Sequence, residues 1–128
     1  SYSSPLDGMD ISNLLFNNYK NLDRVLFWHF PVYIQSKNWK GFNFENRDSL
    51  FRTRPGSVVR KGDWKLHYYF EDKSVELFNL KTDISEKTNL IGEFPEKADQ
   101  LKSLLENWWK ETKAPIPNKL NPEYILDN

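Results

Sequence analysis

Residues 57–80, SVVRKGDWKLHYYFEDKSVELFNL, consist of three short apolar runs joined by the polar turn sequences KGD and EDKS. In the middle run, Trp64, Leu66 and Tyr68 alternate with more polar residues, which is the period of a strand with one buried face. Polar turns of this length between such runs are typical of β-hairpins. The sequence therefore predicts an antiparallel meander of three strands over residues 57–80.

A helical pattern follows the meander, over residues 95–112. Pro95 suits the first position of a helix, and the Glu96 carboxylate complements the positive end of the helix dipole. Apolar residues recur at steps of three and four and so share one face of the helix: Ala98, Leu101, Leu104, Leu105 and Trp108. We expect this face to pack on the meander. The tail, residues 113–128, contains three prolines and is expected to be irregular.

The sequence before the meander predicts one more strand and two irregular segments. Residues 25–30, VLFWHF, form a strand that should end before Pro31, and because it is apolar on both faces we expect it to be covered on both sides. Residues 34–56 are polar with scattered aromatics and are predicted to be a long loop, while residues 1–24 are predicted to be a connector. The fold class is α+β: a small antiparallel sheet of three to four strands packed against one long C-terminal helix.

Composition excludes several classes of protein. A chain of 128 residues fits one domain with a sizeable core. Its 18 basic and 18 acidic residues balance, which argues against a nucleic-acid binder. No apolar run approaches the roughly 18–20 residues of a membrane span. With no cysteine, the chain has no disulfide and no thiolate site.

Motifs that carry chemistry are scarce. There is no zinc-binding helix, calcium loop, glycine-rich phosphate loop or serine nucleophile elbow, so the residues alone favour a binding or structural module. His67 falls on the more polar face of the middle strand and is expected to be half-exposed. His29, within LFWHFPVY, is either a ligand contact or a core residue whose ring nitrogens are satisfied by the protein. As an autonomous carbohydrate-binding or protein-interaction module, the chain would use three aromatic residues as stacking platforms: Trp39, Phe42 and Phe44.

Several segments, in order and with sensible spacing, resemble the C-terminal subdomain of the formylglycine-dependent, arylsulfatase-like sulfatases. The resemblance is strongest to the bacterial enzymes that act on polysaccharides and glycosaminoglycans. It rests on LFWHFPVY, on RPGSVVRKGDWKLHYYFEDKSVELFNL, on a PEKADQLKSLLENWWKETKAPIP helix and on a final NPEY. Together with weaker matches, these segments cover nearly the whole chain: residues 7–15, 26–33, 54–80, 83–90, 95–117 and 121–124.

The resemblance implies that the chain is one part of a sulfuric ester hydrolase involved in glycan degradation. Residues 25–128 correspond to the C-terminal subdomain, and residues 1–24 to the connector from a missing N-terminal alkaline-phosphatase-like domain. That domain holds the formylglycine nucleophile and a calcium ion in the family. Residues 3–7, SSPLD, match the nucleophile motif until Asp7, where arginine is required. No catalytic residue, metal ligand or cofactor is therefore expected in this chain, and alone it is predicted to be inactive.

In the sulfatases that the chain resembles, the C-terminal subdomain helps to form the wall of the substrate pocket. This implies three substrate-binding candidates: His29, Tyr33 and Arg54. Val32 stands where the family pattern has a second histidine, so the sugar that is recognised is expected to differ. The partners implied are the chain's own N-terminal catalytic domain and a sulfated glycan, and the location implied is the periplasm or the exterior of a bacterium.

Overall fold

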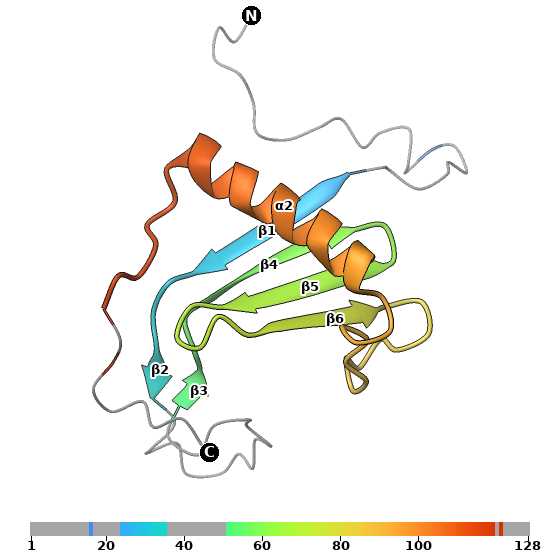
Figure 1. Ribbon diagram of the computed structural model, residues 1–128, viewed down its shortest axis with the longest axis horizontal. Coiled ribbons are helices and arrows are strands. Elements are labelled where there is room, and N and C mark those ends of the chain that lie inside the picture. Colours follow the sequence, from blue (N-terminus) through green and yellow to red (C-terminus); the bar gives the residue numbers. More distant parts are fainter. Residues whose placement is uncertain (1–15, 17–23, 36–50, 120, 122–128) are drawn as a thin grey trace, which may run out of the picture.

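The computed structural model describes residues 16, 24–35, 51–119 and 121. Four strands form the main sheet: β1 Val25–Phe30, β4 Gly56–Lys61, β5 Trp64–Tyr69 and β6 Val75–Asn79. Two shorter strands pair with each other: β2 Ile34–Gln35 and β3 Phe51–Thr53. The helix α2, Pro95–Thr112, lies across one face of the main sheet (Figure 1).

The main sheet has the order β1-β4-β5-β6, and every neighbouring pair is antiparallel. The α+β prediction is confirmed, with the strand over residues 25–30 added to the meander as a fourth strand next to β4. Gly62 turns the chain from β4 to β5 with a φ of 59°, a conformation that glycine adopts without the strain of a side chain.

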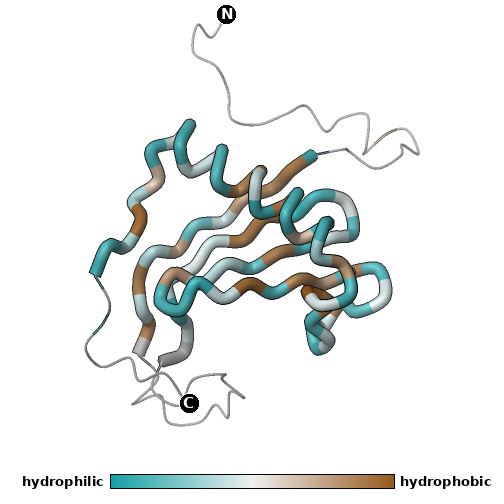
Figure 2. Tube along the Cα trace, viewed as in Figure 1, coloured by the Kyte–Doolittle hydropathy of each residue, from teal (hydrophilic) through white to brown (hydrophobic). Residues whose placement is uncertain are grey.

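The core lies between the sheet and α2. One residue from each strand contributes to a continuous apolar row, because the register pairs Phe27 with Val59, Val59 with Leu66, and Leu66 with Leu77. The helix covers this row with buried apolar side chains: Ala98, Leu101 and Leu105. Figure 2 shows hydrophobic segments along the strands beneath the helix. Burial of the row and the helix stripe is thus what holds the two layers together.

The prediction that β1 is covered on both sides is wrong for the described part of the chain. β1 is an edge strand, and its residues alternate between the face under α2 and the opposite face. On that opposite face Trp28 is 48% exposed and Phe30 is 42% exposed. An apolar pattern reports that a strand favours burial, but it does not report whether the covering element belongs to the same chain.

The segment predicted as a loop over residues 34–56 begins and ends as strand. β2 and β3 extend the β1–β4 hairpin past Pro31 and Pro55, with Ile34 opposite Thr53. Residues 36–50, which include the three aromatic residues of the alternative binding module, lie outside the described residues, as do residues 1–15 and 17–23. No helix in the described ranges combines the length and the apolarity that crossing a bilayer requires.

The connection between β6 and α2 protects the edge of the sheet. The backbone N–H of Leu90 donates to the Leu77 carbonyl at 2.8 Å, and the Asn89 side-chain oxygen accepts from the N–H of Leu77 at 3.1 Å. These bonds occupy backbone groups that would otherwise be available to another strand. The same connection continues over the sheet face that is opposite to α2, where it reaches His67.

Candidate functional site

The face of the sheet opposite to α2 carries a hollow of about 300 Å³. We call this surface the open face and define it by five side chains that line the hollow: Trp28, Phe30, Val58, His67 and Tyr69. They come from β1, β4 and β5, where the alternation of each strand turns every second residue away from the helix. Aromatic surface at a hollow of this kind is typical of a contact with another molecule or domain.

Arg54 also lines the hollow, and its side chain is bonded within the chain. Its guanidinium donates to the Asp72 carboxylate at 3.0 Å, and its central carbon lies 4.6 Å from the centre of the Tyr69 ring. The Arg54 side chain is only 14% exposed. Burial by itself raises the pKa of Asp72, but hydrogen bonds from Ser74 and the charge of Arg54 outweigh it and hold that pKa below its ordinary value. Arg54 is thus a fixed cation beside an aromatic surface.

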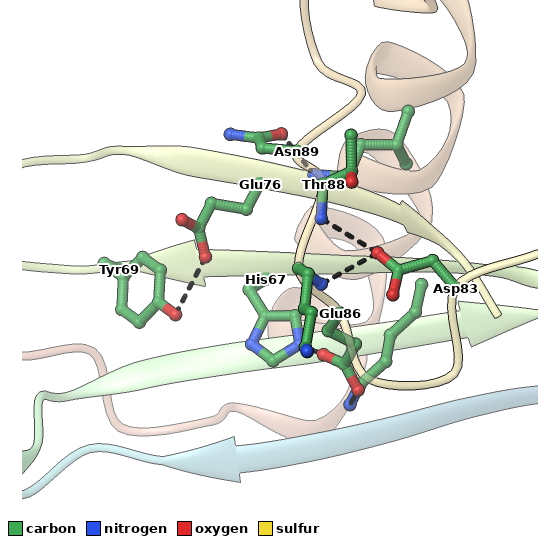
Figure 3. Close-up of polar contacts among 10 residues, drawn as sticks. His67, Tyr69, Glu76, Asp83, Glu86, Thr88 and Asn89 are labelled. Carbon is green, nitrogen blue, oxygen red and sulfur yellow. Dashed lines mark hydrogen bonds and ion pairs between the residues drawn. The ribbon is translucent and has the colours of Figure 1, made fainter. Parts of the chain in front are cut away.

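Glu86 lies over the β5–β6 side of the same face, where its carboxylate contacts two residues of β5 (Figure 3). Its two carboxylate oxygens lie 2.6 Å from Lys65 Nζ and 2.8 Å from His67 Nε2, and its backbone has a left-handed φ of 54°. Asp83 supports the turn by accepting from the N–H groups of Lys87 and Thr88. Burial raises the pKa of the Glu86 carboxyl, but Lys65 and then His67 lower it by more, so that the pKa lies below its ordinary value.

Replacing Glu86 by glutamine is expected to lower the free energy of unfolding at pH 7 by about 1–2 kcal/mol, because charge-assisted hydrogen bonds to two strand residues are lost. The folded pKa of Glu86 is depressed, so its stabilisation is present above the unfolded pKa and disappears as the pH falls through the folded pKa. The difference between Glu86→Gln and the unchanged chain should therefore shrink on acidification. Urea unfolding followed by circular dichroism at several pH values measures it.

The matched control for this substitution is Glu106→Gln. It removes an ion pair with Lys102 that spans 3.6 Å between side chains 40% and 44% exposed. Exposed pairs of this kind contribute about 0.5 kcal/mol or less, so the control should barely change the stability. Equal losses of unfolding free energy for the two variants, or a difference that grows toward low pH, would show that the contacts of Glu86 with Lys65 and His67 do not stabilise the fold.

His29 lies on the other face of the sheet, beneath the C-terminal end of α2. Its Nε2 is 2.9 Å from the Pro115 carbonyl oxygen, which can only accept, so Nε2 carries the hydrogen. In the neutral ring Nδ1 then accepts from the Ser57 hydroxyl at 2.7 Å, and the Ser57 oxygen accepts in turn from the Trp109 indole N–H at 3.0 Å. Both ring nitrogens are bonded within the chain. A contact between His29 and a ligand stays a prediction, and it would require one of these bonds to be exchanged.

Ser57 connects β1, β4 and α2 and is only 1% exposed. We expect Ser57→Ala to lower the free energy of unfolding by about 1–3 kcal/mol, because it leaves two partly buried nitrogens, on His29 and Trp109, without their partner. Ser103→Ala removes an exposed hydroxyl that donates to the Asp99 carbonyl within α2, and it should cost less than about 0.5 kcal/mol. Thermal unfolding of the two variants side by side measures the difference, and equal values would show that the Ser57 link does not stabilise the fold.

Of the three site residues predicted from the sequence, Tyr33 and Arg54 directly flank the neighbouring strands β2 and β3, in which Ile34 pairs with Thr53, whereas His29 lies on the other face of the sheet. Arg54 lines the hollow of the open face, His29 faces the helix, and Tyr33 follows β1 with its hydroxyl buried. Sequence reasoning did not single out Trp28, Phe30 or Glu86 for this surface. The alternation of VLFWHF contains the signal for the two aromatic residues. No pattern in the sequence indicates that Glu86 reaches this surface, since its position depends on a left-handed backbone in a turn.

Among the described residues, no group of three or more His, Cys, Asp and Glu side chains is placed to hold a metal ion. The chemistry that this part of the chain offers is that of recognition: a fixed guanidinium, aromatic surface and strand-borne hydrogen-bonding groups.

A sulfatase of Formosa agariphila is 33% identical over 122 residues, a match that covers 86% of this chain. The similarity supports a relationship between this chain and the sulfatases. The match covers 19% of the relative, so the chain spans about a fifth of the length of the sulfatase that it matches. No protein-family model matches the chain.

Proposed function

We propose that this chain is the C-terminal subdomain of a sulfatase, a sulfuric ester hydrolase, and that it contributes a wall of the pocket for a sulfated sugar but not the nucleophile. The observation that carries the proposal is the 33% identity to a sulfatase over 86% of the chain. The chain accounts for only 19% of that relative, which leaves most of such an enzyme to other polypeptide.

The formylglycine-dependent type is the finer part of the proposal. It is supported by the ordered segments that resemble that family, above all LFWHFPVY and the stretch RPGSVVRKGDWKLHYYFEDKSVELFNL. The described residues offer no metal-binding cluster, and residues 3–7 lack the arginine of the nucleophile motif. In this proposal calcium and formylglycine are held by a separate N-terminal alkaline-phosphatase-like domain in a periplasmic or secreted protein, and the chain alone is inactive.

The open face supports the proposal because it fits an interface inside a larger protein. Trp28 and Phe30 lie side by side on it with about half of their surface in water, at 48% and 42% exposure. Aromatic side chains exposed together on one strand are costly in an isolated domain and are enriched in protein interfaces. We propose that the catalytic domain covers this face, with Arg54 at the rim of the joint. Tyr33, Arg54 and His29 remain the proposed contacts to substrate.

The decisive experiment starts from the longest reading frame that contains this chain. It is expressed with the enzyme that matures formylglycine, and sulfate release from sulfated glycans is measured by ion chromatography. We expect release by the longer protein and none by the 128-residue chain. The proposal fails if the reading frame encodes no α/β domain with a Cys/Ser-x-Pro/Ala-x-Arg motif, or if the 128-residue chain releases sulfate by itself. Glycan binding by a chain whose reading frame has no such domain would favour the autonomous module instead.

A further inference from the structure

A second hollow lies on the opposite side of the sheet from the open face. It has a volume of about 660 Å³ and is formed where the β4–β5 turn meets the first turns of α2. The turn contributes Lys61, Asp63 and Trp64, and the helix contributes Lys97 and Gln100 from one face. Its volume falls within the range of roughly 300–1,000 Å³ that is typical of small-molecule sites. Neither the sulfatase similarity nor the resemblance described above assigns a role to it.

An aromatic residue lines this hollow, and a smaller hollow adjoins it. Trp64 lines the hollow, and its ring centre lies 5.1 Å from that of Phe94. Phe94 is 43% exposed and lines an adjoining hollow of about 420 Å³, which shares Lys97 and Gln100 with the first. That adjoining hollow is also lined by the acidic side chains of Glu93 and Glu96, so we call the hollow of about 660 Å³ alone the turn–helix trough. The Trp64 and Phe94 rings are inclined at 59° to each other, so it is the Trp64 ring alone that offers a flat surface for the apolar C–H face of a saccharide ring.

The rim of the trough carries the polar groups that a saccharide needs. Lys97 Nζ donates to the Gln100 side-chain oxygen at 3.0 Å, and both residues line the hollow. That ammonium keeps two further donors, and the Gln100 amide keeps its N–H₂ for hydroxyl oxygens. Asp63 offers carboxylate oxygens to hydroxyl hydrogens. Lys61 adds a second cation from the turn, so the main hollow has two cations and one anion.

From this combination we propose that the turn–helix trough is a second saccharide-binding site that takes a sulfated sugar. The sugar ring lies on Trp64, the sulfate is bound between Lys61 and Lys97, and Asp63 and Gln100 bind ring hydroxyls. The Trp64 ring and the two cations point to an anionic saccharide, and the choice of sulfate as the anion rests on the proposed function. Such a site binds the sulfated glycan through contacts that are remote from the open face.

The test uses the 128-residue chain and an array that pairs sulfated oligosaccharides with their chemically desulfated counterparts. We expect binding to sulfated members and about tenfold weaker binding to the desulfated ones, since the charge-assisted contacts are lost. The indole N–H signal of Trp64, assigned through Trp64→Phe, should shift in the NMR spectrum when the best sulfated member is added. Failure to bind any member overturns the proposal, as does a shift confined to the indole of Trp28 on the open face.

Charge variants locate the sulfate. Lys61→Gln combined with Lys97→Gln should weaken calorimetric binding about tenfold or more, while changing thermal unfolding little, because Lys61 is exposed and Lys97 is not fully buried. The matched control is Lys81→Gln combined with Lys110→Gln, which removes the same charge from exposed positions outside the trough. The control should change the affinity less than about twofold. Equal losses in the two double variants would mean that net charge alone is responsible and would overturn the site.

This outcome is separable from that of the proposed function. If the longer protein releases sulfate while the double variant at the trough binds as the unchanged chain does, the trough proposal fails and the sulfatase proposal stands. If the chain binds sulfated sugars at Trp64 while the longer protein releases no sulfate, the sulfatase proposal fails and the trough proposal stands.

Discussion

Leu66→Ala is expected to lower the free energy of unfolding by about 2–5 kcal/mol, which is a large part of the roughly 5–15 kcal/mol of an ordinary domain. Leu66 is fully buried in β5, the strand that lies between β4 and β6, and it pairs with Val59 and Leu77 in the row beneath α2. Removing its branched end leaves a cavity between the sheet and the helix, which close packing on both sides prevents from collapsing. Urea unfolding followed by circular dichroism gives the value.

The control for this substitution is Ile84→Ala, which removes a side chain of similar volume that is 78% exposed. It should change the free energy of unfolding by less than about 0.5 kcal/mol. A loss below about 1 kcal/mol for Leu66→Ala, or equal losses for the two variants, would contradict the placement of the core between the sheet and α2.

The second large effect concerns the open face. Trp28→Thr combined with Phe30→Thr should preserve the fold of the 128-residue chain, since threonine is a good strand former and both positions are partly exposed. In the longer protein the same pair should reduce sulfate release about tenfold or more. Two aromatic anchors would then be missing from the joint between the subdomain and the catalytic domain, and such anchors contribute about 2 kcal/mol or more each. Sulfate release and thermal unfolding, measured on both proteins, separate the two effects.

Ile116→Thr is the control for the open-face pair, because Ile116 is 46% exposed but lies in the tail after α2 rather than on the sheet. It should leave sulfate release within about twofold of the unchanged protein. Full activity of the Trp28→Thr, Phe30→Thr protein would show that the open face does not join the catalytic domain.

The fold could be predicted from the sequence because its signals are local. The alternation over residues 57–80 and the stripe over residues 95–112 each record a buried face within one element. The place of β1 beside β4 could not be predicted in this way, since an apolar strand records burial but not its partner. The ends of the supposed loop over residues 34–56 were missed because β2 and β3 are too short for a period to show.

The site was less accessible to sequence reasoning. Arg54 was recognised as a candidate, but its fixed position depends on Asp72, which lies 18 residues away across a hairpin. The link between His67 and Glu86 depends on a left-handed turn that brings the carboxylate back over the sheet. Contacts of this kind arise from the tertiary path of the chain, and no spacing rule applies to them.

The central claim is that the open face of this subdomain is covered by the catalytic domain of a sulfatase. Hydroxyl-radical footprinting of Trp28 and Phe30 tests it most directly, in the 128-residue chain and in the longer protein under the same dose. We expect strong oxidation of both side chains in the chain alone, where they are 48% and 42% exposed, and protection of both in the longer protein. Equal oxidation in the two proteins would contradict it.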